Sequence, residues 1–354
     1  MDDLDLDILR WMYPGGVWSP WGSDPRIGVA EIASHVGLDR TAVWARMRKW
    51  RRDGFWDGFQ THVNARIFGI GMLFVTFRVA DSAEGWDLLD RVGEIEGVVG
   101  ASLHFGDSLV ARDVEHVGVT MVAGNSAEIF PRMEALRQIS PSGVVDGPVV
   151  FEPPPCSREL SDLDWRILSV MVDYPNASVP RAAGVVGVSP KTFTHHRSAL
   201  IDDHVVSSAP KLDWSKMGCV TLGFYCNNAP DVEGARQAVE SRVPHSIPVS
   251  LAGLEGIAPE FESSKCFSQI VPAHSPHEVQ TLVRDLSGIR GVKMVRPELW
   301  GPQREFSGWV RQRIAENLAS PANGRLAVAP GRLGGYIRAR GPPVRHERRV
   351  LASP

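Results

Sequence analysis

The sequence predicts an α+β protein in which two winged helix-turn-helix domains are each followed by a βαββαβ, ferredoxin-like domain. Three observations predict this fold class. Two segments that begin about 150 to 160 residues apart resemble each other along most of their length. Each segment opens with apolar residues at the spacing of a helix. Each then continues with strand and helix patterns in the order βαββαβ.

The internal repeat is clearest at the start of each half. "DLDLDILRWM" begins at Asp3 and "DLDWRILSVM" at Asp162, and their apolar positions match. Further on, "ASHVGLDRTAVWARMRKW" from Ala33 aligns with "AGVVGVSPKTFTHHRSAL" from Ala183, and "VNARIFG" then aligns with "LDWSKMG". A loop resembling "GGVWSPWGS" occurs only in the first half. We therefore expect a diverged tandem duplication.

Three helices are expected at the start of the first half. The first has apolar residues at spacings of three and four, namely Leu4, Ile8, Leu9 and Met12. "VAEIASHVG" follows as a second helix that ends at Gly37. Asp39, matched by Ser189 in the second half, stands at an N-cap position, and a third helix runs from there to about Arg52. This order predicts a helix-turn-helix, and the aromatic stretch "FWDGFQTHV" after Gly54 is expected to form a two-stranded wing.

The third helix of the first half has two contrasting faces at 100 degrees per residue. Val43, Met47 and Trp50 share the side that is expected to pack inward. The other side combines small residues with cations, which suits a DNA major groove because the helix can approach closely while arginine bonds to guanine or phosphate. The residues expected to contact DNA are Thr41, Arg46 and Arg48 near base edges and Arg40, Lys49 and Arg52 on phosphates.

The alternative is that these cations only keep a surface helix soluble. No acidic residue lies between Arg40 and Arg52, and the segment follows a helix-turn, which favours DNA binding. The matching helix "SPKTFTHHRSALIDD" is weaker, because it offers Lys191, Thr192 and His195 but ends in two aspartates. This second helix either contacts phosphates or belongs to a degenerate module that is kept for packing.

The segment after each helix-turn-helix alternates between strand and helix patterns. Residues 72–152 contain, in order, "MLFVTFRV", "AEGWDLLDRVGEIEG", "VVGASLHFG", "HVGVTMVAG", "AEIFPRMEALRQI" and "VVDGPVVFEP", and residues 219–303 repeat the order. Such a βαββαβ unit folds as a four-stranded antiparallel sheet with two helices on one face. We expect its open face to pair with another such sheet.

The expected domain boundaries follow from these patterns. They are 1–68 and 161–218 for the winged helix-turn-helix domains, 69–153 and 219–303 for the ferredoxin-like domains, 154–160 for a linker, 304–319 for an amphipathic helix and 320–354 for a basic, disordered tail.

The carboxyl-terminal segment is basic while the rest of the chain is acidic. From residue 304 onward there are ten arginines against three glutamates, a local charge of +7, which leaves −10 on the preceding residues. "REFSGWVRQRIAENLA" gathers apolar residues on one side and is expected to dock as a helix on the body. Beyond Ser320 the composition is that of a disordered segment. It is either a solvated terminus or a non-specific phosphate-binding segment.

Together, the "DLDLDIL" start, the "VGLDRTAVWARMRKWRRDGF" segment, "VNARIFG" and the βαββαβ domain resemble the Lrp/AsnC family of feast/famine transcriptional regulators. The resemblance covers residues 1–303, twice over. It implies a winged helix-turn-helix that binds double-stranded promoter DNA, and a second domain that forms homo-oligomers through its sheet and binds an amino acid or other small effector. Because family members usually carry one copy, this chain looks like a covalent pseudo-dimer.

The family commonly has a Gly-Asp pair in its effector loop, between the second and third strands. Here "HFGDSL" supplies Gly106 and Asp107, while the equivalent "GLEGIAPEF" of the second half lacks the pair. Gly-Asp is also a common turn pair without a ligand. The altered third helix and the missing loop motif leave open whether both halves bind DNA or one serves as a scaffold.

Two other functions compete with a non-enzymatic regulator. Sirohaem decarboxylases resemble the same fold and work as paired subunits, so the chain is alternatively an enzyme whose His and Arg residues converge on an anionic tetrapyrrole. The candidate histidines are His104, His116, His245, His274 and His277. Single histidines are more often surface residues, and the basic helix favours the regulator. The third alternative is a ligand-sensing scaffold without DNA binding.

Composition and motif spacing argue against several other classes. With 43% apolar and 22% charged residues, no apolar run of membrane-spanning length and an acidic "MDDLDLDIL" start, we expect a cytoplasmic protein without a membrane segment. Adjacent His195 and His196 would point about 100 degrees apart on a helix, so they form no metal site. The cysteines, Cys156, Cys219, Cys226 and Cys266, show no CxxC spacing. No metal and no cofactor is expected.

Overall fold

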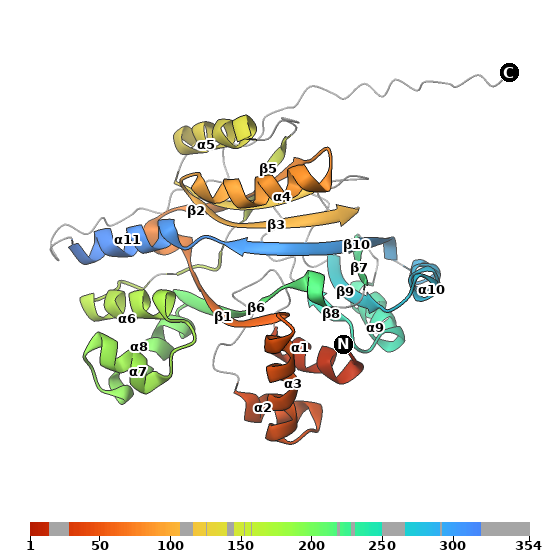
Figure 1. Ribbon diagram of the computed structural model, residues 1–354, viewed down its shortest axis with the longest axis horizontal. Coiled ribbons are helices and arrows are strands. Elements are labelled where there is room, and N and C mark those ends of the chain that lie inside the picture. The colour runs from red at the N-terminus through yellow and green to blue at the C-terminus, as the bar shows by residue number, and fades with distance from the viewer. Residues whose placement is uncertain are drawn as a thin grey trace.

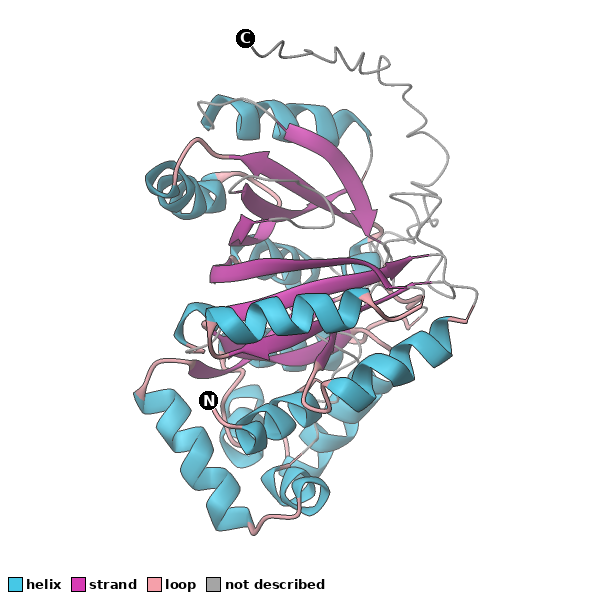
Figure 2. Ribbon diagram, turned by 90° about the vertical axis from the view of Figure 1, so that its right-hand side faces the viewer, coloured by secondary structure: helices cyan, strands magenta, loops and turns pink. Residues whose placement is uncertain are grey.

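The computed structural model describes residues 1–13, 28–106, 116–124, 126–139, 145–151, 153–156, 158–217, 220–227, 231–249, 266–290 and 292–319. Within these ranges helices and antiparallel strands alternate, so the predicted α+β class is confirmed. Figure 1 shows two three-helix units on the same side of a central sheet, with a two-stranded ribbon between the helices and the sheet. Figure 2 shows the same arrangement from the side, with strands at the centre and helices around them.

The first three-helix unit consists of α1 (Asp3–Met12), α2 (Val29–Val36) and α3 (Arg40–Arg52). In a capping box, Asp2 accepts from the backbone N–H of Asp5 and the Asp5 carboxylate accepts from that of Asp2. α2 ends at Gly37 in the left-handed conformation (φ +68°), which glycine adopts without a Cβ clash. Asp39 caps α3 by accepting from the backbone N–H of Ala42 at 2.9 Å. The predicted helices and caps are therefore confirmed.

The second unit consists of α6 (Asp162–Asp173), α7 (Val179–Val186) and α8 (Pro190–Asp202). Its local signals match those of the first unit. Ser161 and Asp164 form a capping box, Gly187 ends α7 with φ +79°, and Ser189 caps α8 by accepting from the backbone N–H of Thr192. Each unit buries its own apolar cluster, which in the first unit includes Val43, Met47 and Trp50 of α3, as predicted.

The strand that follows each unit pairs with its counterpart from the other half. β1 (Trp56–Val63) runs antiparallel to β6 (Val206–Leu212), with Thr61 opposite Ser208. The sequence predicted a wing formed locally after Gly54. Instead each half supplies one strand here, and the exposed backbone N–H and C=O groups of each find their partners across the halves. Asn176, in the turn after α6, also accepts from the backbone N–H of Phe59 on β1 at 2.8 Å.

The first βαββαβ domain comprises β2 (Gly71–Arg78), α4 (Ser82–Arg91), β3 (Val98–Gly106), β4 (His116–Ala123), α5 (Ser126–Ile139) and β5 (Val145–Phe151). Its strand order is β5-β2-β4-β3. Alternate residues such as Val75 and Val119 pack with Leu88 of α4 and Met133 of α5 in one core. The opposite face carries buried polar side chains, namely Thr76, His104 and His116.

The second domain repeats the order with β7 (Val220–Asn227), α9 (Val232–Arg242), β8 (Ile247–Val249), β9 (Cys266–Ala273), α10 (Pro276–Ser287) and β10 (Val292–Glu305). η2 (Ala65–Phe68), η3 (Val92–Glu94) and η4 (Trp214–Lys216) are short 3-10 helices. Here the strand order is β10-β7-β9-β8, which matches that of the first domain.

β10 belongs to both domains. Its residues 292–297 pair with β7, and its residues 298–305 pair antiparallel with β3 of the first domain, with an irregularity between Trp300 and Gln303. The result is one eight-stranded sheet of order β5-β2-β4-β3-β10-β7-β9-β8. We expected the two sheets to pair through their open faces, whereas the hydrogen bonds of the described residues join them edge to edge.

The helix predicted for 304–319 begins later than expected, because Arg304 and Glu305 complete β10. α11 (Gly308–Ala319) then packs against α6, and its Trp309 and Ile314 are buried. It therefore docks on the body as predicted. The tail 320–354 and the "GGVWSPWGS" loop lie outside the described residues. No helix within the described ranges is long and apolar enough to cross a membrane.

Candidate nucleic-acid interface

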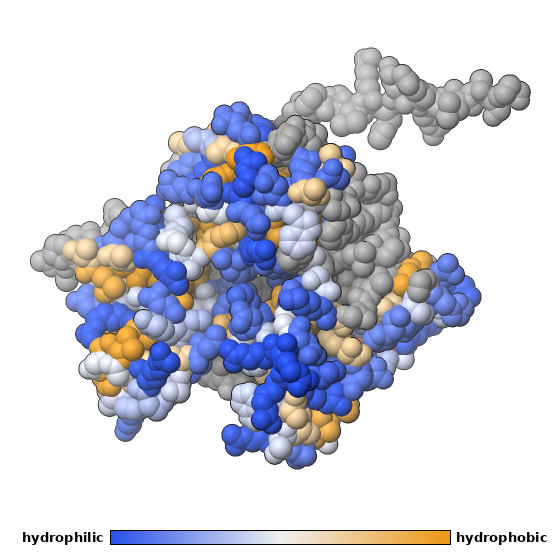
Figure 3. Space-filling view, viewed as in Figure 1, coloured by the Kyte–Doolittle hydropathy of each residue, from blue (hydrophilic) through white to orange (hydrophobic). Residues whose placement is uncertain are grey.

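α3 presents a cationic outer face with small residues between the cations. Arg40, Thr41, Ala45, Arg48, Lys49 and Arg52 are exposed. Within the described ranges, the side chains of Arg40, Arg48 and Lys49 form no ion pair or hydrogen bond, while Arg52 lies 3.6 Å from the Asp53 carboxylate. Figure 3 shows strongly hydrophilic surface over α3. The predicted outer face is therefore present on the folded chain.

Arg46 has a different position from the rest. Its Nη1 atom lies 2.7 Å from Oδ1 of Asp2 and 2.9 Å from Oδ1 of Asp5, and the side chain is half-buried against α1. Burial acts to raise the pKa of Asp2, but the hydrogen bond and charge of Arg46, the backbone hydrogen bond from Asp5 and the charge of the amino terminus together outweigh burial and lower that pKa. The hydrogen bond to Asp2 likewise raises the pKa of Arg46. This position does not fit the expected contact with base edges, since the guanidinium holds α1 and α3 together.

Two exposed residues of the same face escaped the sequence analysis. Trp44 is 38% exposed, a high value for tryptophan on a helix whose other large apolar residues are buried. It precedes Arg48 by one helical turn, so helical spacing alone places it on the basic face. Arg51 is also exposed, and its guanidinium lies over the Trp56 ring, 6.0 Å from the ring centroid. Both add to the surface available for a nucleic acid.

α8 offers a poorer surface in the second unit. Lys191 and His195 are exposed, but Thr192 is half-buried, and its hydroxyl lies 2.8 Å from that of Ser189. His196 turns away from His195 and places Nδ1 2.8 Å from the Asp164 carboxylate. The structure therefore brings Lys191 and His195 to the outer face and keeps Thr192 within the cap of the helix.

The histidines named as enzyme candidates do not gather in one place. His104 and His116 lie opposite each other on β3 and β4, with parallel rings 5.1 Å apart and 2% and 1% exposure. His245 instead bonds Asp7 of α1 at 2.9 Å. His274 and His277 are exposed where α10 begins. Only the first two form a pair.

The His104–His116 pair has a polar neighbourhood. The Ser102 hydroxyl lies 2.7 Å from Nε2 of His104, and all three side chains are on the sheet face opposite α4 and α5. No group of three potential metal ligands occurs within the described residues. Of the expected effector residues, Gly106 ends β3, and Asp107 lies outside the described residues.

Comparisons with known proteins give two kinds of similar structure. The siroheme decarboxylase NirDL is 14% identical over 89% of this chain and 98% of its own, with a TM-score of 0.44. The leucine response regulatory protein LrpA of Mycobacterium tuberculosis is 20% identical over 45% of this chain and 99% of its own (TM-score 0.30). An AsnC family transcriptional regulator from Agrobacterium tumefaciens is 22% identical over 46% and 97% (TM-score 0.29).

No family model matches the sequence, and no curated protein matches it. The similar structures thus include both a siroheme decarboxylase and transcriptional regulators.

Proposed function

We propose that this chain is a sequence-specific DNA-binding regulator that contacts double-stranded DNA through the outer face of α3. The observation that carries the proposal is the unpaired state of Arg40, Arg48 and Lys49 on one exposed helix face within the described chain. Surface cations that serve only solubility are commonly accompanied by carboxylates one turn away. α3 has no acidic residue at all, and it follows a helix-turn.

The contacts within α3 are revised from those expected. Arg48 and Thr41 are assigned to base edges, together with Trp44, whose apolar ring suits a thymine methyl group. Arg40, Lys49 and Arg52 are assigned to phosphates. Arg46 is left out because its guanidinium is held by two carboxylates of the first unit.

α8 is assigned a lesser role. Lys191 and His195 are available for phosphates, with Thr192 supporting the helix cap, so binding by the two units is unequal. We further propose that the regulator acts in the cytoplasm, that it associates with further copies through the ferredoxin-like domains, and that a small effector such as an amino acid binds near Gly106 and Asp107.

The experiment is a selection from random duplexes followed by fluorescence anisotropy at several salt concentrations. We expect one enriched motif and a steep salt dependence, because each phosphate contact adds about −0.9 to the log–log slope. Arg48→Ala should relax the base preference, whereas Arg290→Ala, an exposed cation of the second ferredoxin-like domain, should leave it unchanged. An unenriched pool and no binding at low salt would contradict the proposal and favour a ligand-sensing scaffold.

A second candidate is an enzyme that decarboxylates an anionic tetrapyrrole. The observation that favours it is the buried His104–His116 pair beside Ser102, because a DNA-binding protein has no evident need for two stacked imidazoles inside its sheet. Decarboxylation breaks a C–C bond, releases CO2 and adds a proton to the remaining carbon, and imidazole is a suitable proton donor. Anaerobic incubation with sirohaem tests this directly, since each decarboxylation lowers the product mass by one CO2.

A further inference from the structure

A cavity of about 310 Å³ lies where the first helix-turn-helix unit, the β1–β6 ribbon and the end of β10 meet. It is lined by the end of α3 and the turn after it, by both strands of the ribbon, by Asp213 and Lys216 at the two ends of η4 and by the last residues of β10. This volume is at the lower end of the range for small-molecule sites. It would hold one metabolite, and it is too small for a tetrapyrrole or a nucleic acid.

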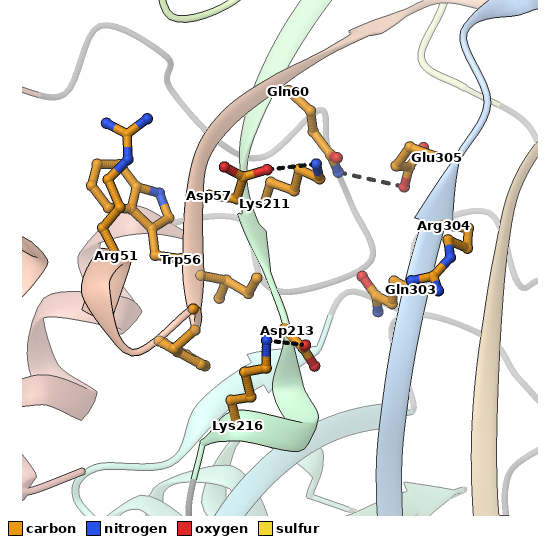
Figure 4. A pocket seen from close by; sticks show the side chains of 13 residues that line it. Arg51, Trp56, Asp57, Gln60, Lys211, Asp213, Lys216, Gln303, Arg304 and Glu305 are labelled. Atoms are coloured by element: carbon orange, nitrogen blue, oxygen red, sulfur yellow. Dashed lines mark hydrogen bonds and ion pairs between the residues drawn. The ribbon is translucent and has the colours of Figure 1, made fainter. Parts of the chain in front are cut away.

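The lining is rich in cations. Four basic side chains face three carboxylates, namely Arg51, Lys211, Lys216 and Arg304 against Asp57, Asp213 and Glu305. Figure 4 shows that two of the carboxylates form ion pairs, Asp57 with Lys211 and Asp213 with Lys216. Those ion pairs are 2.7 Å and 3.3 Å long. Arg51 has no carboxylate partner within the described chain and lies over Trp56.

Two buried polar atoms of the lining residues have no hydrogen-bond partner in the described chain. They are Nε1 of Trp56, a residue that is 6% exposed, and Oε1 of Gln60. A buried N–H group without an acceptor destabilises the fold, so such groups are rarely left unpaired. The indole N–H needs an acceptor, and an oxyanion beside Arg51 would supply one.

Glu305 makes the charge of this cavity depend on pH. The residue is exposed to solvent, and desolvation of its carboxylate by the neighbouring groups of the cavity raises its pKa to about 7, against the opposing effects of Gln60 and Lys211. Near neutral pH a large fraction of the molecules therefore carries a neutral Glu305, which makes the net charge of the lining more positive by one. The other charged or titratable groups around it are Tyr13, Arg51, Asp57, Lys211, Asp213, Lys216 and Arg304, and the last of these is paired with Asp90 at 3.4 Å.

We propose that this cavity is a binding site for a small organic anion, one that carries a carboxylate or phosphate group which Arg51, Lys211 and the Trp56 indole N–H hold together. Both anion types share the required chemistry, because each presents several acceptor oxygens to guanidinium and ammonium groups. The cavity contains Arg51 of α3 but none of the residues assigned above to base edges or phosphates. It stands independently of whether the chain binds DNA.

The experiment uses the full chain and two probes, succinate and inorganic phosphate, each titrated by calorimetry at pH 6.5 and 8.5. At pH 6.5 we expect at least one probe to bind with a Kd below about 1 mM. Affinity should fall several-fold at pH 8.5, where Glu305 is ionised and repels the anion, and Glu305→Gln should abolish that fall. Preference for one probe would assign the natural ligand to the carboxylates or to the phosphates.

A matched pair of variants locates the bound anion. The double variant Arg51→Gln/Lys211→Gln should weaken binding at least about tenfold, while Arg290→Gln, outside the cavity, should not. In ¹H–¹⁵N spectra the Trp56 indole N–H signal, assigned by its loss in Trp56→Phe, should move downfield as the probe binds. Binding that survives the double variant, an indole signal that stays in place, or no binding of either probe at 10 mM (about ten times that Kd limit) would overturn the proposal.

Discussion

In both helix-turn-helix units a buried aspartate of the first helix bonds a side chain of the third helix, but the outer faces of the two units differ. In the first unit the buried Asp5 of α1 accepts from Arg46 of α3, and in the second the buried Asp164 of α6 bonds His196 of α8. Arg46 and His196 occupy equivalent positions, seven residues after the N-caps Asp39 and Ser189. Both aspartates also complete the capping boxes of their helices.

The two units differ in the residues on the exposed face of the third helix. Around Arg46 the exposed face of α3 carries only cations and small or aromatic residues, while α8 combines Lys191 with two terminal aspartates. An arginine in a basic helix is therefore not evidence of base contact by itself. A buried carboxylate opposite such an arginine engages its guanidinium. Arg46 and His196, at the equivalent position of the two units, both join the first helix to the third in this way.

The largest effect on stability is expected from removing the carboxylate of Asp5, which bonds Arg46. Asp5→Ala leaves the half-buried Arg46 with Asp2 as its remaining carboxylate partner and leaves the buried indole N–H of Trp50 without its acceptor. We expect a loss of about 1–3 kcal/mol in the free energy of unfolding, because the buried donor of Trp50 becomes unpaired and Arg46 loses its buried acceptor. Urea unfolding followed by circular dichroism measures it. Glu31→Ala, on the exposed face of α2, should change stability by less than about 0.5 kcal/mol, and an equal loss in both variants would refute the assigned role.

The second test compares the two outer faces. Arg48→Ala/Lys49→Ala on α3 should reduce DNA affinity about thirtyfold and lower the salt slope by one to two, because one or two phosphate contacts are lost. Lys191→Ala/His195→Ala on α8 should reduce affinity less than about threefold. Anisotropy titrations of both double variants against the same selected duplex give the ratio. Equal losses of DNA affinity would show that the second unit contributes as much to DNA binding as the first, and the inferred difference between the units would be wrong.

The third test concerns acid stability in the second unit. Burial acts to raise the pKa of Asp164, but hydrogen bonds from His196 and Ser161 outweigh it and hold that pKa below its usual value. The folded state therefore binds this proton less readily than the unfolded state, so the carboxylate stabilises the fold above about pH 4 and loses this effect as the pH falls through its folded pKa.

Asp164→Asn measures this contribution. We expect the variant to be less stable than the wild type by about 1–2 kcal/mol at pH 7, with the difference shrinking below pH 4. Thermal unfolding at pH 7, 5 and 3 follows the trend. A difference that grows on acidification would mean that Asp164 is protonated in the native protein.

The smallest effect is expected where the second unit contacts β1. The Asn176 side chain accepts from the backbone N–H of Phe59 and donates to its carbonyl, next to Gly58, whose φ of +82° and missing Cβ admit the amide. Asn176→Ala should cost about 1 kcal/mol. Gly58→Ala should cost more, since a Cβ there would meet the Asn176 amide and the left-handed backbone is strained. Melting temperatures of both variants decide the order, and a larger loss for the asparagine variant would contradict it.

The helices, their caps and the order of strands were predictable because each follows from local spacing. Gly37, Asp39 and Ser189 mark their helix ends in the sequence and in the structure alike. Pairings between segments far apart were not predictable. The partner of β1 is some 150 residues away, and nothing in "FWDGFQTHV" distinguishes a local wing from a strand that pairs across the halves.

The same limit applies to the site. The composition of α3 led us to expect Arg46 near base edges, but only the fold shows that Asp2 and Asp5 lie opposite it. Trp44 was overlooked because aromatic residues are usually assigned to the core, and its exposure depends on which helices cover it. The residues that line the cavity beside Arg51 come from three separate segments of the chain, so no single motif predicts it.

The way β10 spans both sheets has a consequence for how the molecule behaves on dilution. Since β10 and the β1–β6 ribbon connect the halves within a single polypeptide, the contact between halves has a fixed effective concentration. In a protein assembled from separate subunits, the equivalent contact weakens as the protein becomes scarce. Here the pairing of the halves is a first-order process. The melting temperature of the protein should therefore stay the same across a thousandfold change in protein concentration. In a cell that holds only a few copies of the protein, the two halves of each copy would still be fully paired.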